Sequence, residues 1–564
     1  MVVLGVWDGH DSGAALVIEG KIVAAANEER FTRRKTEIRF PTHSIRFCLE
    51  KARLKPKDID QIAVPSSDFS NSITRLFPSI KEDYYFVRRK LKKGNKLSSV
   101  NRPLMNMLGR LRSNKFFKKI AIETTKKNLV RLGFSKRVNI NVVDHHLAHA
   151  ASAYFCSGYD KAICITMDGL GDGISTTINL CEKGNIEKVH ESKTKDSLGL
   201  LFQDATQILG FRILEDEGKV MALSDYSKKP KKNPLMSMYS IKEGKFILNT
   251  TMNERWKKLQ KLTTKTNKED FSFFVQETLE EKIKELIKFC IETYDITNFC
   301  FAGGVFSNVK ANKKIREIKE VKDWFIFPNM GDGGLASGAA LHVSSILFNT
   351  RPYRLNNAYL GPDFTDSQIQ KELMNNSKKI EFEKIDDKNR YAAELLEEDK
   401  ILFWFDNRME MGPRALGARS ILARPDILEN RKRLNSIIKK RDPFQPFCPS
   451  ILESHAKKYL KDFNIPEPFM TMAYDTKEEA KDDFIAASSV DGTTRPQTVN
   501  EINNNYYKTI KHFNRLTGIG GILNTSFNTH GEPIVCTPND AIKATVRNKQ
   551  DYLIIGNYVV RRKK

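Results

Sequence analysis

Two stretches of the chain share one pattern of apolar and polar positions. Residues 2–26 (VVLGVWDGHDSGAALVIEGKIVAAA) and 162–190 (AICITMDGLGDGISTTINLCEKGNIEKVH) each contain three apolar or β-branched runs, which glycine-rich turns separate. Short apolar runs bounded by such turns are typical of strands, so each stretch predicts a three-stranded β-meander. The first run of each copy ends in Asp-Gly, at Asp8 and at Asp168. Two copies of one pattern predict an internal duplication.

Helical and mixed patterns follow each meander. Helical periodicity marks residues 42–54 and 270–294. An apolar strand that passes through glycines into a helix is predicted for residues 298–315 (NFCFAGGVFSNVKANKKI) and 325–343 (FIFPNMGDGGLASGAALHV). Backbone amides at such a junction bind phosphate or ribose in many proteins, although glycine turns also serve as plain structural punctuation.

A polar stretch with prolines after residue 350 (NTRPYRLNNAYLGPDFTD) marks the expected boundary between two domains. A chain of 564 residues is too long for one ordinary core. We expect a duplicated α/β domain over residues 1–350 and an α+β domain over residues 355–564.

The second domain contains several rigid turns that carry arginine, lysine, amide or hydroxyl side chains. They are RMEMGPRALGAR (408–419), KKRDPF (439–444), VDGTTRPQ (490–497) and LNTSFNTHGEP (523–533). Arginine offers a planar and permanently charged fork that fits phosphate and carboxylate oxygens. A single arginine is as often part of a surface ion pair, but the set of turns predicts an anion-binding pocket.

Composition narrows the class of protein. Hydrophobic residues make up 40% of the chain, which also has 31 glycines and 20 prolines, as in globular proteins. No apolar run approaches the roughly 18 residues of a membrane span, so we expect no membrane partner. The first residues lack a basic region and a cleavage site, so we expect no signal peptide. The eight cysteines lack C-x-x-C spacing and predict buried thiols in a reducing compartment, the cytoplasm.

The net charge of +24 is unevenly distributed. Residues 88–119 carry twelve lysines and arginines and no acidic residue. Such a run attracts polyanions, so it suggests an anionic acceptor such as an acidic glycan or a nucleotide-linked sugar, or a nucleic acid. The alternative is a solvated insertion without a partner. The run lacks the regular aromatic residues of a single-strand-binding surface, so nucleic acid is not the partner we expect.

Residues 144–150 (DHHLAHA) contain three of the 10 histidines of the chain. His145 and His149 are four residues apart, so a helix places both imidazoles on one face, about one turn apart. Histidines with this spacing either bind a metal ion or are core and cap residues.

The order of the motifs resembles a known enzyme family. The duplicated Asp-Gly meander resembles the superfamily of actin, Hsp70 and sugar kinases, in which nucleotide binds between two related lobes. The chain as a whole resembles the NodU/CmcH family of O-carbamoyltransferases, whose members modify nodulation factors, cephalosporins and aminoglycosides. The resemblance covers most of the chain except the regions near 70–135 and 226–268. Its main motifs are GHDSGAALVIEGKIVAAANEERFTRRK, DHHLAHAASAYF, AGGVFSN, RMEMGPRALGARSILARP, KRDPFQPFCPSIL, VDGTTRPQTV and LNTSFNTHGEPIV.

The resemblance implies a reaction in two steps. A YrdC-like C-terminal domain would form carbamoyl-adenylate from carbamoyl phosphate and ATP with Mg²⁺, and pyrophosphate would leave. The N-terminal domain, related to the tRNA threonylcarbamoyladenosine transferases, would then transfer the carbamoyl group to an acceptor hydroxyl as AMP leaves. Two alternatives stay open: a tRNA threonylcarbamoyladenosine-type transferase, and a non-catalytic nucleotide-binding protein of the actin-like superfamily. The resemblance also allows a homodimer.

The resemblance further implies functional residues in the N-terminal domain. The expected metal ligands are His145, His149, Asp168 and Asp332. Two nitrogen and two oxygen ligands suit Fe²⁺, Zn²⁺ or Mn²⁺, and the family suggests iron. His10 is the candidate general base, with phosphate binding as its alternative role. We expect Asp144 to cap the helix or to orient His145.

Substrate-binding residues are expected in both domains. The candidates for nucleotide binding in the N-terminal domain are His146, Lys219, Gly303, Gly304 and Asn308. The candidates for carbamoyl phosphate and ATP binding in the C-terminal domain are Arg414, Lys440, Arg441, Arg495, Asn524 and Ser526. Arginines there would neutralise phosphate, and the amide and hydroxyl groups would fix the carbamoyl group by hydrogen bonds.

Overall fold

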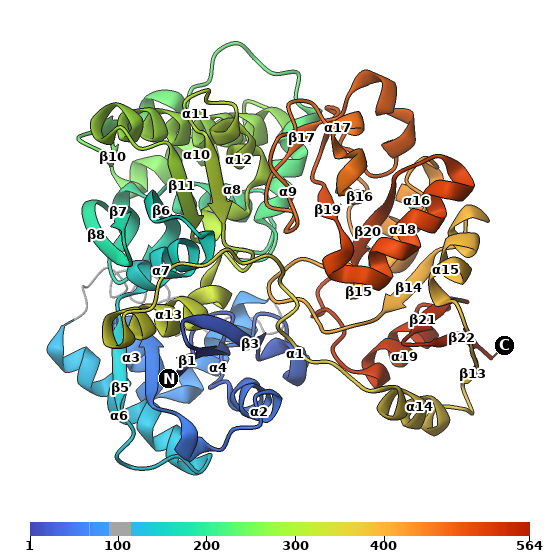
Figure 1. Ribbon diagram of the computed structural model, residues 1–564. Helices are drawn as coiled ribbons and strands as arrows, with labels where there is room; N and C mark the ends of the chain where they lie inside the picture. The colour runs from blue at the N-terminus through green and yellow to red at the C-terminus, as the bar shows by residue number, and fades with distance from the viewer. Residues whose placement is uncertain (67, 90–113, 564) are drawn as a thin grey trace. The chain divides into compact units, whose positions relative to one another are not determined.

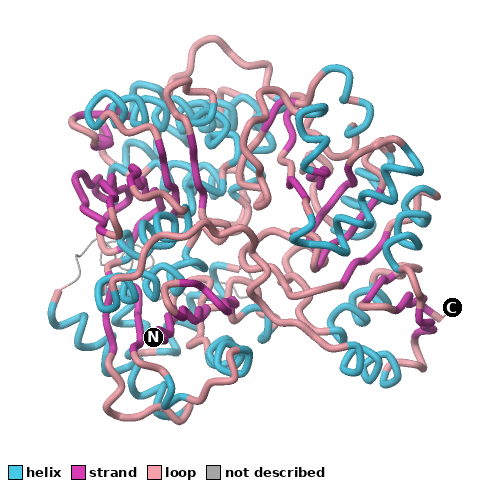
Figure 2. Tube along the Cα trace, viewed as in Figure 1, coloured by secondary structure: helices cyan, strands magenta, loops and turns pink. Residues whose placement is uncertain are grey.

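The structure is a computed structural model that describes residues 1–66, 68–89 and 114–563, drawn in Figures 1 and 2. The chain divides into two compact units. The first comprises Met1–Glu28 and Thr36–Leu355, and the second comprises Glu29–Lys35 and Asn356–Lys564. Most of the basic run predicted to attract an anionic acceptor lies outside the described residues.

The first unit contains two five-stranded sheets with the same topology (Figure 1). In each sheet the first three strands form an antiparallel meander, and two later strands extend it in parallel beside the first. The first sheet has the order β3-β2-β1-β4-β5 and the second the order β8-β7-β6-β11-β12. The predicted duplication is therefore confirmed, and with it the α/β class of the unit.

The bounds of these strands match the apolar runs of the sequence. The first sheet comprises β1 (Val2–Trp7), β2 (Gly13–Ile18), β3 (Lys21–Asn27), β4 (Gln61–Pro65) and β5 (Ile140–Val143). The second sheet comprises β6 (Lys161–Gly171), β7 (Ile174–Glu182), β8 (Asn185–Lys193), β11 (Asn298–Ala302) and β12 (Asp323–Ile326). The two predicted helices are also present, as α2 (Thr42–Lys51) and α11 (Lys268–Tyr294).

Two helices lie between the two sheets and cross the halves of the duplication (Figure 2). Helix α7 (His145–Ser157) follows the first sheet in the chain but packs on β6 and β11 of the second. Helix α13 (Leu335–Phe348) follows the second sheet but packs on β1, β2 and β4 of the first. The two helices also pack against each other. Each half therefore needs a helix from the other half to cover its sheet.

Glycines permit this close packing. A Cβ atom on Gly338 of α13 would lie 1.8 Å from the carbonyl oxygen of Ala148 in α7. A Cβ atom on Gly5 of β1 would lie 1.9 Å from the carbonyl oxygen of Ala336 in α13. Both neighbours are backbone atoms, so no side-chain rotation relieves such a contact.

The second unit contains a mixed eight-stranded sheet with helices around it, which confirms the expected α+β class. The strand order is β13-β22-β21-β14-β15-β20-β16-β19. Helices α15 (Lys388–Glu397) and α18 (Asn504–Thr517) pack together, and α18 also packs on β16 and β20. The strands are β13 (Ile380–Lys384), β14 (Leu402–Phe405), β15 (Arg419–Ala423), β16 (Cys448–Leu452), β19 (Gln497–Val499), β20 (Gly521–Ser526), β21 (Leu553–Ile555) and β22 (Tyr558–Arg562).

Two expectations from composition can be compared with the fold. All eight cysteines are free and buried, as their apolar surroundings predict. Within the described ranges, no helix combines the length and the hydrophobicity that crossing a bilayer requires.

We expect the substitution Gly338→Ala to lower the melting temperature of the first unit by several degrees. The added methyl group would overlap the backbone of α7, and overpacking of this kind costs about 1–3 kcal/mol or more. Gly218→Ala is the matched control, because the added Cβ would meet no heavy atom within 4 Å apart from its chain neighbours and the backbone of its own helix. Thermal unfolding followed by circular dichroism measures both. Equal melting temperatures for Gly338→Ala and the wild type would show that α7 and α13 do not cross this closely.

Candidate metal centre and anion site

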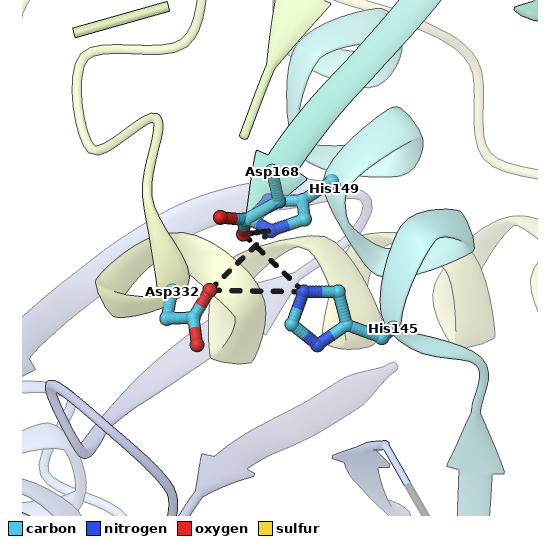
Figure 3. A group of neighbouring side chains, drawn as sticks. All are labelled: His145, His149, Asp168 and Asp332. Carbon is cyan, nitrogen blue, oxygen red and sulfur yellow. Dashed lines mark hydrogen bonds and ion pairs between the residues drawn. The ribbon is translucent and has the colours of Figure 1, made fainter. Parts of the chain in front are cut away.

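Four side chains from three parts of the first unit converge on one point (Figure 3). His145 and His149 lie on the first two turns of α7, with their rings 4.8 Å apart between centroids. Asp168 lies in β6, and Asp332 lies in the short turn before α13. One ligand atom from each residue lies within 4.8 Å of all the others. The predicted set of four ligands is thus brought together.

The spacing of these atoms fits a metal ion. The Nε2 atom of His149 lies 3.2 Å from Asp168 Oδ2 and 3.6 Å from Asp332 Oδ1. The Nε2 atom of His145 lies 3.5 Å and 3.7 Å from the same two oxygens. Tetrahedral ligands about 2.1 Å from a metal ion are themselves roughly 3.4 Å apart. His145 Nε2 is buried and makes no hydrogen bond, as expected for an atom that would coordinate a metal ion.

The electrostatics of the cluster agree with this interpretation. Burial lowers the pKa of His145, but the charges of Asp332 and Asp168 outweigh it and raise the pKa to about 9. Burial raises the pKa of Asp168, yet the two histidines hold it well below its usual range. Burial and the charge of Asp168 together raise the pKa of Asp332. The carboxylates of Asp168 and Asp332 therefore favour the protonated form of His145. A bound metal cation would take the place of the proton on this imidazole.

Asp172, rather than Asp144, fixes the first residue of α7. Asp144 occupies the N-cap position, but its side chain makes no capping hydrogen bond and lies 3.3 Å from the amine of Lys118. The backbone N–H of His145 donates instead to Asp172 Oδ2 at 2.8 Å. The hydroxyl of Ser66 donates to Asp172 Oδ1 at 2.8 Å. The predicted capping by Asp144 is therefore wrong, because the cap comes from the turn after β6.

Glycines bring the strands and α7 close to the cluster. A Cβ atom on Gly171 would lie 2.2 Å from the ring of His145. Gly303 has a φ of +105°, and a Cβ atom on it would lie 2.1 Å from the carbonyl oxygen of Met167. A Cβ atom on Gly304 would lie 3.2 Å from Asp168 Oδ1. The glycines predicted to bind nucleotide, Gly303 and Gly304, thus border the cluster of His145, His149, Asp168 and Asp332.

Two other predicted nucleotide contacts are used within the protein. The ring nitrogens of His146 lie 2.7 Å from Thr166 Oγ1 and 3.1 Å from the carbonyl oxygen of Ile174. The amide of Asn308 pairs with Gln276 in both directions, at 2.8 and 3.0 Å, and caps α12 (Val309–Arg316). Burial and the charges of the neighbouring histidines keep the pKa of His146 well below its usual value. These contacts favour structural roles for both side chains.

His10 lies in the turn after β1. Its Nδ1 atom is 3.0 Å from Asp11 Oδ2, and its carbonyl oxygen accepts a hydrogen bond from the indole of Trp7 at 2.6 Å. The side chain of His10 is 22% exposed. Both the ring and the backbone of this turn are therefore oriented by neighbours, as a catalytic base requires.

A buried ion pair beside this turn was not predicted. Arg75 of α3 (Phe69–Leu76) contacts both carboxylate oxygens of Asp8, with distances from 2.8 to 3.1 Å. Lys81 of α4 (Pro78–Arg88) donates to the carbonyl oxygen of Asp8. Burial raises the pKa of Asp8, but the charges of Arg75 and Lys81 outweigh it and hold the pKa at about 2. Both cations lie where the family resemblance is weakest, so no motif marked them.

Lys219 lies in α9 (Glu217–Leu223), with its amine 3.5 Å from Asp216 Oδ1 and over the ring of Phe211. Its neighbour Glu217 was also not predicted. Burial raises the pKa of Glu217 to about 7, and the charge of His10 acts in the opposite direction. A carboxyl group that titrates near neutrality beside the candidate base is a further functional candidate.

Arginines of three turns meet in the second unit. Arg495 lies 2.7 and 3.1 Å from Cys448 Sγ through Nη2 and Nε. Burial and the positive charge of Arg495 lower the pKa of Arg414 to about 9. Burial lowers the pKa of Arg441 to about 10, and Arg495 contributes to this shift. The guanidinium of Arg441 also lies over the ring of Phe447, at 4.4 Å. The structure thus brings together three of the arginines predicted to bind an anion.

A buried lysine adjoins this site at a position next to the predicted one. Lys440 is exposed and ends the helix in a left-handed conformation. The amine of Lys439 is instead buried, and donates to Ser526 Oγ at 3.1 Å and to Asn528 Oδ1 at 2.6 Å. Burial and the charges of Arg441 and Lys35 hold the pKa of Lys439 well below its usual value. The position of each lysine around the helix determines which amine is buried, and the sequence did not reveal that position.

Asn524 lies beside the arginines, on β20. Its side-chain N–H groups donate to the carbonyl oxygen of Ala415 at 3.1 Å and to Ser450 Oγ at 3.0 Å. Its Oδ1 atom is buried and accepts no hydrogen bond. An orphaned buried acceptor next to an anion site is suited to a ligand with an N–H group.

We expect His149→Ala to weaken metal binding by at least about 100-fold, since loss of a mere outer-shell partner costs 10–100-fold. Purified protein is loaded with Fe²⁺ or Zn²⁺, dialysed, and its metal content is measured by elemental analysis. His190→Ala is the control, because this imidazole pairs with the hydroxyl of Tyr294 on a different part of the unit. Full metal retention by His149→Ala would contradict the assigned ligand set.

We expect Asp8→Asn to destabilise the first unit at pH 7 by about 3 kcal/mol, because Arg75 stays buried without a charged partner. The pKa of Asp8 is lowered from 3.8 to about 2 on folding, so its contribution is present above pH 3.8 and is lost as the pH falls toward 2. Urea unfolding at pH 7 and at pH 2.5 measures both. A difference between wild type and variant that does not narrow in acid would contradict the ion pair.

Sequence comparison identifies the family. The sequence model described as Carbamoyltransferase N-terminus matches residues 2–341, and that described as Carbamoyltransferase C-terminus matches residues 393–562. The chain is 33% identical to an uncharacterized protein of Methanocaldococcus jannaschii, with 99% of each chain covered. It is 32% identical to the Nodulation protein NolNO of Sinorhizobium fredii, with 98% of this chain and 79% of that one covered.

The chain also resembles a solved structure at low sequence identity. HypF of T. kodakarensis is 13% identical with a TM-score of 0.37, and the match covers 61% of this chain and 48% of that one. The two matched sequence models and the relatives at full length carry the assignment instead. The chain belongs to the carbamoyltransferase family and is a carbamoyl-transferring enzyme.

Proposed function

We propose that the enzyme is an O-carbamoyltransferase that works through carbamoyl-adenylate. Water first cleaves carbamoyl phosphate to carbamate and inorganic phosphate. A carbamate oxygen then attacks the α-phosphorus of ATP, bound as its Mg²⁺ complex, and pyrophosphate leaves. Finally an acceptor hydroxyl attacks the carbamoyl carbon, its proton passes to a base, and AMP leaves. Carbamate needs this activation because its oxygen is a poor leaving group until it is bonded to phosphate.

The crowded cations of the second unit carry this proposal. Arg414 and Arg441 both have a lowered pKa because burial and Arg495 oppose their charge. A phosphate group among them would supply negative charge and offset the cost of burial. Lys439, at the end of the adjoining helix, would contribute a fourth cation. We therefore assign adenylate formation to the second unit.

Asn524 is suited to hold the carbamoyl group. The orphaned Oδ1 atom is an acceptor, and its direction is fixed because both of its amide hydrogens are donated to the protein. A carbamoyl NH₂ group is a donor of matching size. Ser526 is tied to Asn528 and Lys439, so in our proposal it positions the lysine.

The first unit would perform the transfer. His145, His149, Asp168 and Asp332 would hold a divalent cation, which supplies positive charge for the phosphate of the adenylate. Two nitrogen and two oxygen ligands suit Fe²⁺, Zn²⁺ or Mn²⁺, and we favour Fe²⁺. His10 would accept the proton of the acceptor hydroxyl. The carboxylate of Asp11 holds Nδ1 as the protonated nitrogen, which leaves Nε2 as the basic one.

The acceptor in this proposal is a hydroxyl of a sugar or small molecule. Modification of tRNA with a threonylcarbamoyl group is the second candidate, since a net charge of +24 favours a polyanion. Saturating tRNA would then inhibit the enzyme or become modified. We place the reaction in the cytoplasm, because eight unpaired thiols suit a reducing compartment.

We expect pyrophosphate release from ATP to require carbamoyl phosphate and to fall at least about 100-fold in Arg495→Ala, because one charge of the phosphate site is lost. The assay needs no acceptor and couples pyrophosphate to a colorimetric readout. Lys439→Ala should lower kcat/KM at least about tenfold. Lys440→Ala is the adjacent control and should change kcat/KM less than twofold. Folded, metal-loaded protein that releases no pyrophosphate on addition of carbamoyl phosphate would exclude the proposed activation step.

A further inference from the structure

A seven-residue segment of the N-terminal half of the sequence belongs to the second unit. Residues Glu29–Lys35 leave the first meander after β3 and return to the first unit at Thr36. Four of these seven residues are arginine or lysine. Arg33 and Thr36 both have positive φ values, of 58° and 54°. Such values are costly for residues other than glycine, so tertiary contacts must hold the segment in place.

Arg30 holds the loop that carries Arg414. The side chain of Arg30 is buried, and its Nη2 atom donates to the carbonyl oxygen of Gly412 at 2.8 Å. Inside the same loop, Glu410 Oε1 accepts from the backbone N–H groups of Leu416 and Arg419, at 2.7 and 3.2 Å. The loop is thus closed from within by Glu410 and fixed from outside by Arg30, two residues before Arg414.

Arg33 holds the loop that carries the partners of Lys439. Its Nη1 atom donates to the carbonyl oxygen of Ile534 at 2.6 Å, and its Nη2 atom donates to that of Pro533 at 2.8 Å. The same loop bears Asn528, which accepts from the amine of Lys439. One guanidinium therefore fixes two successive carbonyl groups through a planar pair of N–H donors, a geometry that the non-planar ammonium group of lysine does not reproduce.

Phe31 joins the two loops. Its ring packs on Met409 of the first loop and on Ile534 and Cys536 of the second. Three side chains of the segment therefore contact the two loops. Arg30 binds the first loop, Arg33 binds the second, and Phe31 packs on both. The segment thereby connects the loop that carries Arg414 with the loop that binds Lys439.

We propose that residues 29–35 set the distance between the Arg414 loop and the Lys439-binding loop, with Arg33 as a positioning residue for the activation reaction. This inference rests on the proposed adenylate-forming function of the second unit. Besides an ion pair with Asp540 at 3.8 Å, Arg33 contacts backbone carbonyl groups, and in this proposal it does not bind substrate. It acts by holding Asn528 and thereby Lys439 at the correct distance from the three arginines, and misplacement of a binding group by about 1 Å is enough to cost up to 100-fold in rate.

The experiment measures carbamoyl-phosphate-dependent pyrophosphate release by the full chain. We expect Arg33→Ala to lower kcat/KM for carbamoyl phosphate and ATP by about 10- to 100-fold, mainly through KM. Added guanidinium at millimolar concentration should restore part of this loss, and Arg33→Lys should not recover wild-type KM. Arg390→Ala is the matched control, because Arg390 forms an exposed ion pair with Glu394 on α15 of the same unit.

The outcomes separate this inference from the proposed function. Wild-type protein that releases no pyrophosphate would overturn the proposed function itself. Wild-type activity together with an unchanged kcat/KM in Arg33→Ala would overturn only the positioning role. If Arg33→Ala does not fold, Arg33→Lys decides: a raised KM with an unchanged melting temperature supports positioning, and wild-type kinetics overturn it. Metal content of the first unit should be equal in all variants.

Discussion

The close crossing of α7 and α13 is the contact on which the first unit depends. Gly338 of one helix and Ala148 of the other approach so closely that a single methyl group would overlap the backbone. This crossing holds the first turns of α7 next to the turn before α13. His145 and His149 consequently face Asp332, while β6, on which α7 packs, supplies Asp168. The geometry of the four-residue cluster is thus a product of helix packing rather than of any local motif.

Each unit also contains a group of charged side chains whose pKa values are shifted by burial and by neighbouring charges. In the first unit, two carboxylates crowd around histidine rings, and the proton of His145 is held unusually tightly. In the second, burial and like charge oppose the charged forms of Arg414, Arg441 and Lys439. Folding provides the free energy that brings each group of charges together. A bound ligand of opposite charge would reduce this electrostatic cost. Such preorganisation favours binding of ions over binding of neutral molecules.

The sequence predicts those features that depend on local pattern. The two meanders, the glycine-to-helix junctions and the helical phase of His145 and His149 follow from periodicity, and the structure has all of them. It does not predict contacts that depend on tertiary packing. Asp144 has the identity and the position of a helix cap, but Asp172 reaches the N–H group from another turn.

Two further contacts that the sequence does not predict also depend on tertiary packing. Lys439 and Lys440 are identical in chemistry, and only the packing of their helix against the loop of Ser526 decides which amine is buried. The pairing of Asp8 with Arg75 joins residues 67 positions apart, and no motif marks Arg75. The four-residue cluster was expected because the spacing within α7 places His145 and His149 on one face and the family resemblance adds Asp168 and Asp332.

The exchange of helices between the two sheets has a consequence for synthesis of the chain. The first sheet is complete at β5, which ends at Val143, but α13, which covers it, begins only at Leu335. At about 5–20 residues per second, a ribosome needs roughly 10–40 seconds to make the intervening chain. During that interval the apolar face around Gly5 has no covering helix. The nascent protein therefore exposes an aggregation-prone hydrophobic surface that a chaperone would have to shield.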